Sequence, residues 1–289
     1  MVFIVGSRVR DYTVERQIGA GGMGTVWAAR DERSGGEVAL KVLGESNDLD
    51  TARLRLMREA QASRAIKHPA IVPVSEVFEY QESPVLVMPL LHGETLRRLI
   101  QRQQSASPAE CARLLVPIAE ALSEAHGAGI VHRDLKPENI FIEAAQSDEL
   151  VAPSRIRLLD FGVARSYAPL LGFEQTPITA LGSLVGTIAY MAPEQALNPS
   201  QSDPRVDVWA FGVTLYELLS GCRPIEGDTK PEIMRQLLVG GITPLAVLNP
   251  DLPPDLLRAV TDMLTRSPER RAPNLDFVTG LLRSYLAAT

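Results

Sequence analysis

The chain has 289 residues, of which 45% are hydrophobic and 22% are charged, with a formal net charge of -6. These proportions exclude a fibrous repeat and a disordered chain, and the negative balance argues against a protein that coats nucleic acid. The two cysteines, Cys111 and Cys222, lack the spacing of a metal site or a disulfide framework, which fits a reducing cytosol. No apolar run approaches bilayer-spanning length. We therefore expect a cytoplasmic chain, or the cytosolic part of a longer one.

Residues 11–43 alternate apolar and polar positions around a group of glycines, which predicts twisted antiparallel strands. Missing side chains let backbone N–H groups approach a phosphate closely, and the G-x-G-x-x-G spacing is typical of such loops. A plain hairpin turn and a dinucleotide-binding unit share this spacing, but the latter requires a helix after the glycines. Because strand-like Thr25-Val-Trp-Ala28 comes next, we predict a strand-turn-strand flap over phosphates. The run comprises Gly19, Ala20, Gly21, Gly22, Met23 and Gly24.

A charged pair is predicted next along the chain. Lys41 ends an apolar strand-like run, where an ammonium group is costly unless it has a partner or a ligand, although many such lysines simply reach water. Residues 48–66 have apolar positions at steps of three and four, which predicts a helix, and Glu59 falls within its apolar stripe. Taken alone, Glu59 is an ordinary solvated charge, but a Lys41–Glu59 pair would hold the ammonium ready for phosphates.

The remaining elements set the fold class. Residues 70–88 are predicted to be extended, and helices are predicted over 107–128, 206–219, 254–264 and 274–287. Strands followed by helices indicate an α+β chain with two lobes: a small antiparallel sheet with one helix at about 11–88, and a larger, mainly helical lobe at about 94–287. The joint is expected at about 89–93. Residues 144–154 and 165–183 have little periodicity and are expected to be loops.

Two segments bring together the residue types that phosphoryl transfer needs. The first is Val131-His-Arg-Asp-Leu-Lys-Pro-Glu-Asn-Ile-Phe141, and the second is Leu158-Leu-Asp-Phe-Gly162. Both match the catalytic-loop and metal-loop signatures of protein kinases. A single aspartate would most often be a turn or cap residue. The ordered set of glycines, lysine, glutamate and these two segments is specific.

The sequence resembles the eukaryotic-like, or Hanks-type, serine/threonine protein kinases of the bacterial branch, from about Tyr12 to Leu286. The resemblance implies one catalytic domain over 1–289 that transfers phosphate from ATP to protein serine or threonine in signal transduction. It implies that Asp134 accepts the hydroxyl proton and that Lys136 steadies the phosphate. It implies that Asn139 and Asp160 bind Mg²⁺, with Mn²⁺ as an alternative. Positioning and charge neutralisation then supply most of the acceleration.

The resemblance also implies an adenine site. Val26, Ala39 and Phe141 would cover the adenine faces, Met88 would wall the back of the pocket, and Pro89 and Leu91 would offer backbone groups. Pro89 stands where the family commonly has an acidic residue, but proline keeps the carbonyl that adenine needs. Ser63 replaces a larger apolar residue near Glu59, so we expect that the active helix position depends on a partner or on phosphorylation.

The resemblance implies further roles. Glu194, in the segment Gly186–Glu194, is expected to pair with Arg271, and Asp207 is expected to brace the catalytic-loop backbone, although a helix N-terminal charge would occupy the same place. Thr187 and Lys136 resemble the serine/threonine subclass. Arg133, beside Asp134, suggests control by a phosphate that orders the loop. Thr176, Thr179 and Ser183 are the expected acceptors, and self-association would allow phosphorylation in trans.

Two other kinds of protein compete with this interpretation. A pseudokinase that only binds partners would carry degraded lysine, aspartate or asparagine positions, and none is visible. A small-molecule kinase such as an aminoglycoside phosphotransferase would lack the Ala192-Pro-Glu194 segment and the long loop before it. The sequence does not name the protein substrate. Glu138 gives only a faint indication of a preference for basic residues before the acceptor.

Overall fold

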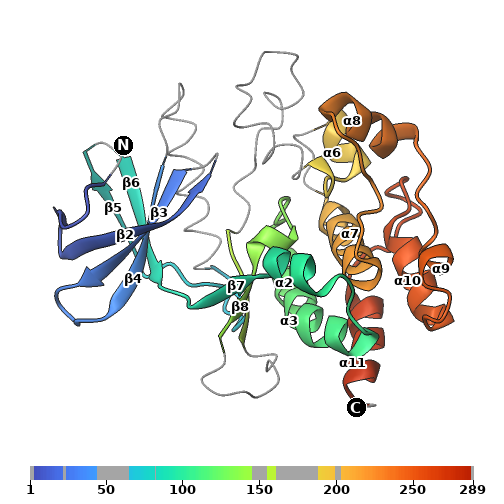
Figure 1. Cartoon of the computed structure of the whole chain (residues 1–289), viewed down its shortest axis with the longest axis horizontal. Coiled ribbons are helices and arrows are strands. Elements are labelled where there is room, and N and C mark those ends of the chain that lie inside the picture. The colour runs from blue at the N-terminus through green and yellow to red at the C-terminus, as the bar shows by residue number, and fades with distance from the viewer. Residues whose placement is uncertain are drawn as a thin grey trace. The chain divides into compact units, whose positions relative to one another are not determined.

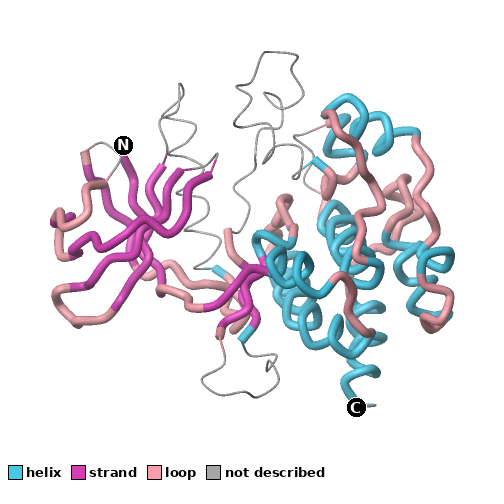
Figure 2. The backbone as a smooth tube through the Cα atoms, in the orientation of Figure 1, coloured by secondary structure: helices cyan, strands magenta, loops and turns pink. Residues whose placement is uncertain are grey.

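The computed structural model describes residues 3–21, 24–43, 65–81, 83–144, 155–160, 188–198 and 203–287. The chain divides into two compact units, the first formed by 1–67 and 71–92 and the second by 68–70 and 93–289. Strands dominate the described part of the first unit, and helices dominate that of the second (Figures 1 and 2). The predicted α+β organisation, with an antiparallel sheet at the N-terminal side and a mainly helical C-terminal side, is confirmed.

The first unit is a six-stranded antiparallel sheet in the order β1-β2-β3-β4-β6-β5. The alternating pattern predicted over residues 11–43 folds into three of these strands, because each places one side chain of every two on the same face. The strands are β1 (Arg8–Val9), β2 (Tyr12–Gly21), β3 (Gly24–Asp31), β4 (Glu37–Leu43), β5 (Glu76–Tyr80) and β6 (Ser83–Pro89).

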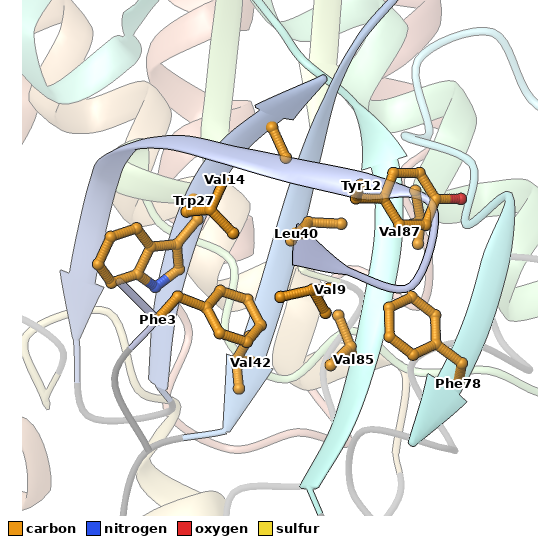
Figure 3. Packing of buried hydrophobic residues seen from close by; sticks show 11 residues of the cluster. Phe3, Val9, Tyr12, Val14, Trp27, Leu40, Val42, Phe78, Val85 and Val87 are labelled. Atoms are coloured by element: carbon orange, nitrogen blue, oxygen red, sulfur yellow. The ribbon is translucent and has the colours of Figure 1, made fainter. Parts of the chain in front are cut away.

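One face of this sheet carries a large hydrophobic cluster of the first unit. Figure 3 shows aliphatic and aromatic side chains from β2, β3, β4, β5 and β6 gathered on that face. The Phe3 ring, 5% exposed, packs against Trp27 and Tyr80 with centroid distances of 5.9 and 5.8 Å. Tyr12 stacks on Phe78 at 5.9 Å. Phe3, which precedes β1, is therefore part of this cluster.

The second unit begins with a three-stranded antiparallel sheet of β7 (Gly93–Thr95), β8 (Ile140–Glu143) and β9 (Ile156–Leu158). Gly93 has φ 149°, and a Cβ atom there would lie 2.0 Å from the carbonyl oxygen of Ile142. A side chain at this position is therefore excluded, which makes glycine a requirement for the pairing of β7 with β8.

Helices make up most of the second unit. The four predicted helices are confirmed as α3 (Pro108–Gly127), α7 (Arg205–Ser220), α10 (Pro254–Met263) and α11 (Asp276–Ala287). Those not predicted individually are α2 (Leu96–Gln103), α6 (Pro193–Leu197), α8 (Lys230–Val239), α9 (Leu245–Leu248) and the 3₁₀ turn η1 (Pro137–Asn139). No helix in the described ranges is long and apolar enough to cross a membrane. The helix predicted over 48–66 lies almost wholly outside them.

The centre of the helical unit is α7. Every residue from Val206 to Leu219 is buried, so this helix is covered on all sides, as expected of a core helix. It packs against α3 and α10, and α3 also packs against α11. Asp207, in the first turn of α7, thus lies on a helix that is buried along almost its whole length.

Candidate active site

The first unit places the predicted nucleotide residues on one face of its sheet. Val26 lies opposite Lys41 across β3 and β4, and Ala39 lies opposite Met88 across β4 and β6. Directly opposed residues share a face, and Leu40, between Ala39 and Lys41, points into the core on the other face. Lys41 is 4% exposed. Residues predicted to surround adenine and phosphate therefore share one face of the sheet, opposite the face of the large hydrophobic cluster. Leu86, opposite Lys41, and Val74 form a smaller buried cluster on the shared face, and Met88 packs against it.

The glycine run includes the last residues of β2 and the first residue of β3. Gly21, the last residue of β2, pairs with Gly24, the first residue of β3. The predicted strands on both sides of the run are confirmed, and a strand follows the glycines rather than the helix that a dinucleotide-binding unit requires. Gly22 and Met23 lie outside the described residues, as does Glu59. The Lys41–Glu59 pair stays a prediction.

The residues predicted for the joint come at the end of β6 and just after it. Pro89 ends this strand opposite Val38 and is exposed, and Leu91 is half-buried two residues later. In the second unit, Phe141 lies in β8 between the buried residues Ile140 and Ile142. Phe141 therefore points to the opposite face of its strand from these two.

The catalytic-loop segment brings a lysine onto an aspartate. The Lys136 ammonium donates to both carboxylate oxygens of Asp134, at 3.0 and 2.9 Å. The Asn139 side-chain amide donates to the backbone oxygen of Asp134 at 2.8 Å and to a carboxylate oxygen at 3.3 Å. Lys136 and Asn139 are buried. These bonds fix the Asp134 carboxylate and both neighbours in one cluster.

Asp207 fixes the backbone of this loop through hydrogen bonds. Its carboxylate, fully buried, accepts backbone N–H bonds from His132 at 2.8 Å and from Arg133 at 2.7 Å. The Nε2 atom of His126, on α3, lies 2.8 Å from the same carboxylate. An ionised carboxylate only accepts, so Nε2 of His126 carries the proton. The predicted bracing role of Asp207 is confirmed.

His132 and Leu159 connect the loop to Asp160. Nδ1 of His132 accepts from the Asp134 backbone N–H at 3.3 Å, and its Nε2 lies 3.2 Å from the Leu159 carbonyl oxygen. The Leu159 N–H donates to the Asn139 carbonyl at 2.8 Å. Both backbone groups of Leu159 are therefore tied to the loop, which places the next residue, Asp160, beside it.

Two residues of this region have a strained backbone. Among the described residues other than glycine, five have positive φ, and two of these are Arg133 at 65° and Asp160 at 53°. Such conformations cost on the order of 1–3 kcal/mol and persist where surrounding contacts enforce them. Arg133 has those contacts, because Asp207 accepts from its N–H and Gln195 donates to its carbonyl at 3.2 Å.

The segment after the long loop is anchored by a buried ion pair. The Arg271 guanidinium donates to both carboxylate oxygens of Glu194, at 2.5 and 2.9 Å. Both residues are buried, and Arg271 also donates to the backbone oxygens of Thr265, Arg205 and Arg266. The predicted Glu194–Arg271 pair is confirmed, and its bidentate geometry suits a structural role.

Comparison with known proteins agrees with this geometry. The family model described as "Protein kinase domain" matches residues 12–279. The chain belongs to the protein kinase family. Two curated relatives are serine/threonine-protein kinase PknA of Mycobacterium tuberculosis, 35% identical over 90% of this chain, and serine/threonine-protein kinase pkn3 of Myxococcus xanthus, 34% identical over 92%. The kinase chain spans 58% of PknA and 48% of pkn3.

Some of the kinase residues that hold the site escaped the sequence-based prediction. His126 is the basic residue of the last turn of α3, a signal that could have marked it. Gln195 gives no such signal, since its role depends on the folded position of Arg133. No group of three or more metal-binding side chains of the His, Cys, Asp or Glu type occurs within the described ranges. Ser63, Thr176, Thr179, Ser183 and Thr187 lie outside them.

Proposed function

We propose that this chain transfers the terminal phosphoryl group of ATP to serine and threonine hydroxyls of proteins. The observation that carries the proposal is the Asp134 carboxylate, which receives the Lys136 ammonium on both oxygens within a loop clamped by Asp207. The names of PknA and pkn3 as serine/threonine-protein kinases support the same acceptor class. We also propose that residues 1–289 form a single catalytic domain.

In this proposal Asp134 orients the acceptor hydroxyl and accepts its proton. A hydroxyl that approaches the carboxylate also comes within reach of Lys136, which contacts both carboxylate oxygens. Lys136 is therefore placed to stabilise negative charge on the phosphoryl group during transfer. The half-buried position of Asp134 suits this role, since a partly desolvated site strengthens such contacts.

Asn139 and Asp160 are the proposed Mg²⁺ ligands, with Mn²⁺ as an alternative. An amide oxygen and a carboxylate are the hard oxygen ligands that these cations take. The bond from Nδ2 of Asn139 to the Asp134 backbone oxygen identifies the nitrogen end of the amide, so the oxygen end is the one available for a metal. When bound, the ions would neutralise charge on the ATP phosphates.

We propose that the first unit binds the rest of ATP. Lys41 would contact the phosphates with Glu59 as its partner, and the glycine run 19–24 would cover them. The shared sheet face of Val26, Ala39 and Met88 supports an adenine site there. Pro89, Leu91 and Phe141 complete the proposed adenine contacts.

The test uses labelled ATP, Mg²⁺ and generic protein substrates. Wild type is compared with Asp134→Asn and Lys41→Met, each checked for folding by circular dichroism. Wild type is expected to label protein serine and threonine, and both variants are expected to lose at least about 100-fold, on the scale of general acid–base contributions. Equal labelling by all three proteins would overturn the proposal.

Autophosphorylation on Thr176, Thr179 or Ser183 belongs to the same proposal, with self-association allowing transfer in trans. Mass spectrometry of ATP-incubated protein is expected to find phosphate on at least one of them, and a phosphate-free loop in an active sample would contradict this proposal.

We further propose a cytoplasmic location, which fractionation with an antibody against the chain would check.

A further inference from the structure

A charged cluster in the second unit reaches the catalytic loop without belonging to the proposed catalytic machinery. Arg97, on α2, donates from Nε to Oε1 of Glu138 at 2.8 Å and from Nη1 to Oε1 of Glu217 at 2.7 Å. Its Nη2 donates to Oε2 of Glu217 at 3.4 Å and to the Tyr190 hydroxyl. The Arg97 side chain is 19% exposed. The Arg97 guanidinium thus donates hydrogen bonds to the carboxylates of both Glu138 and Glu217.

In the proposed function a protein substrate approaches Asp134, and one member of the cluster, Glu138, lies four residues after it in the same loop. Glu138 is in η1, between Lys136 and Asn139 at the catalytic loop. Tyr190 comes after the long loop and precedes the anchored residue Glu194. Glu217 comes from the buried helix α7. An acidic pair at this place would attract a basic side chain near the acceptor hydroxyl if nothing else neutralised it.

Three of the four carboxylate oxygens of Glu138 and Glu217 accept hydrogen bonds within the cluster. Both oxygens of Glu217 contact Arg97, and Oε2 also accepts from the Tyr190 hydroxyl. Oε1 of Glu138 accepts from Arg97, while its Oε2 is buried and has no hydrogen-bond partner among the described residues. A substrate guanidinium would therefore have to compete with Arg97 for Glu217 and for Oε1 of Glu138, and burial closes Oε2 of Glu138 to it. Burial opposes the charge on Arg97, but its bonds to Glu217 outweigh this and raise its pKa, so the internal cation persists at any working pH.

We propose that Arg97 is a specificity-determining residue: it occupies the acidic Glu138–Glu217 site from within, so that this kinase does not select a basic residue beside the acceptor. The inference rests on the proposed function, since it concerns the peptide preference of that reaction. It replaces the expectation that Glu138 favours basic substrates.

Two simpler hypotheses predict different results. If Glu138 selects substrate arginine directly, wild type prefers arginine peptides and Glu138→Gln abolishes that preference. If the cluster is only structural, Arg97 variants change stability but not peptide preference. Our inference predicts an arginine preference only after Arg97 is removed, and only while Glu138 is present.

The experiment measures kcat/KM for a neutral threonine peptide and for a set in which arginine replaces alanine at each flanking position in turn. Wild type and Glu138→Gln are expected to show ratios within about threefold of one at every position. Arg97→Gln and Arg97→Ala are expected to gain about tenfold or more at one or two positions, the scale of one hydrogen bond to a charged group. The double variant Arg97→Gln/Glu138→Gln is expected to lose most of this gain.

The matched control is Arg102→Gln, which removes another arginine of α2 that pairs with a carboxylate, Glu94, at 2.8 Å. It is expected to leave the ratios unchanged. A wild type that prefers arginine about tenfold, with the preference lost in Glu138→Gln, would overturn the inference, and this comparison needs no Arg97 variant to fold. Folded Arg97 variants with wild-type ratios would also overturn it. Absence of transfer to every peptide would instead count against the proposed function.

Discussion

Asp207→Asn removes one charge from the base of the catalytic loop and keeps the shape of the side chain. Oδ1 accepts from the Arg133 N–H and Oδ2 from the His132 N–H. Whichever position the new NH₂ group takes, it therefore faces a backbone donor. At least one charge-assisted bond is lost, which costs about 2–3 kcal/mol. The loop that holds Asp134 is the element that loses the bond.

If the transition state bears this whole cost, kcat/KM for peptide phosphorylation falls about 30-fold to 160-fold. Urea unfolding monitored by circular dichroism is expected to show a loss of similar size in the free energy of unfolding. The control is Glu232→Gln, which removes an acidic residue from the first turn of α8. A helix-dipole charge contributes about 0.3–1 kcal/mol to stability and does not touch the loop. If Asp207→Asn kept kcat/KM within about threefold of wild type, Asp207 would be no more than a helix N-terminal charge.

Three further predictions concern stability. Arg271→Met leaves Glu194 charged and buried, so unfolding in urea is expected to become easier by about 3–5 kcal/mol; a second change, Glu194→Leu, should recover most of the loss, and no recovery would contradict the pairing. Phe3→Ala removes a buried ring and is expected to cost about 3 kcal/mol of unfolding free energy, whereas a change under about 1 kcal/mol would show that the first residues are not part of the core. Glu76 accepts from the Tyr12 hydroxyl, which with Arg33 lowers the pKa of the Glu76 carboxyl below 4.5. The ionised Glu76 carboxylate therefore stabilises the folded state fully above pH 4.5, and this stabilisation is lost as the pH falls through the lowered pKa. Glu76→Gln is expected to cost about 1 kcal/mol at pH 7, and the difference from wild type should shrink in titrations below pH 4.5; a constant difference would refute this explanation.

The sheet and the long helices could be predicted because their information is local. Every second residue of β4, namely Val38, Leu40 and Val42, is apolar, and the apolar repeat of α3 is bounded by the cap residue Ser107, whose side chain accepts from the Glu110 N–H. Short helices such as α9, of four residues, are too brief to show a period. They form where the chain already packs against a neighbour.

The contacts of the candidate site also differ in whether the local sequence predicts them. Asp134, Lys136 and Asn139 lie within six consecutive residues, so their motif predicts their contact. The bond between His126 and Asp207 joins positions 81 residues apart, and Arg97 meets Glu217 across 120 residues. Neither pair carries a local pattern, because each contact depends on how α2, α3 and α7 pack. Resemblance could name Asp207, but only the fold brings His126 to it.

The enclosure of α7 has a consequence for heat inactivation. The catalytic loop takes its shape from Asp207 on a helix that is covered on every side, so the loop should not melt separately from the core beneath it. Phosphoryl transfer should then disappear in the same temperature interval as the cooperative calorimetric transition of the helical unit. Substitutions that open a cavity around α7 should shift both midpoints together, even when no altered atom lies near a substrate.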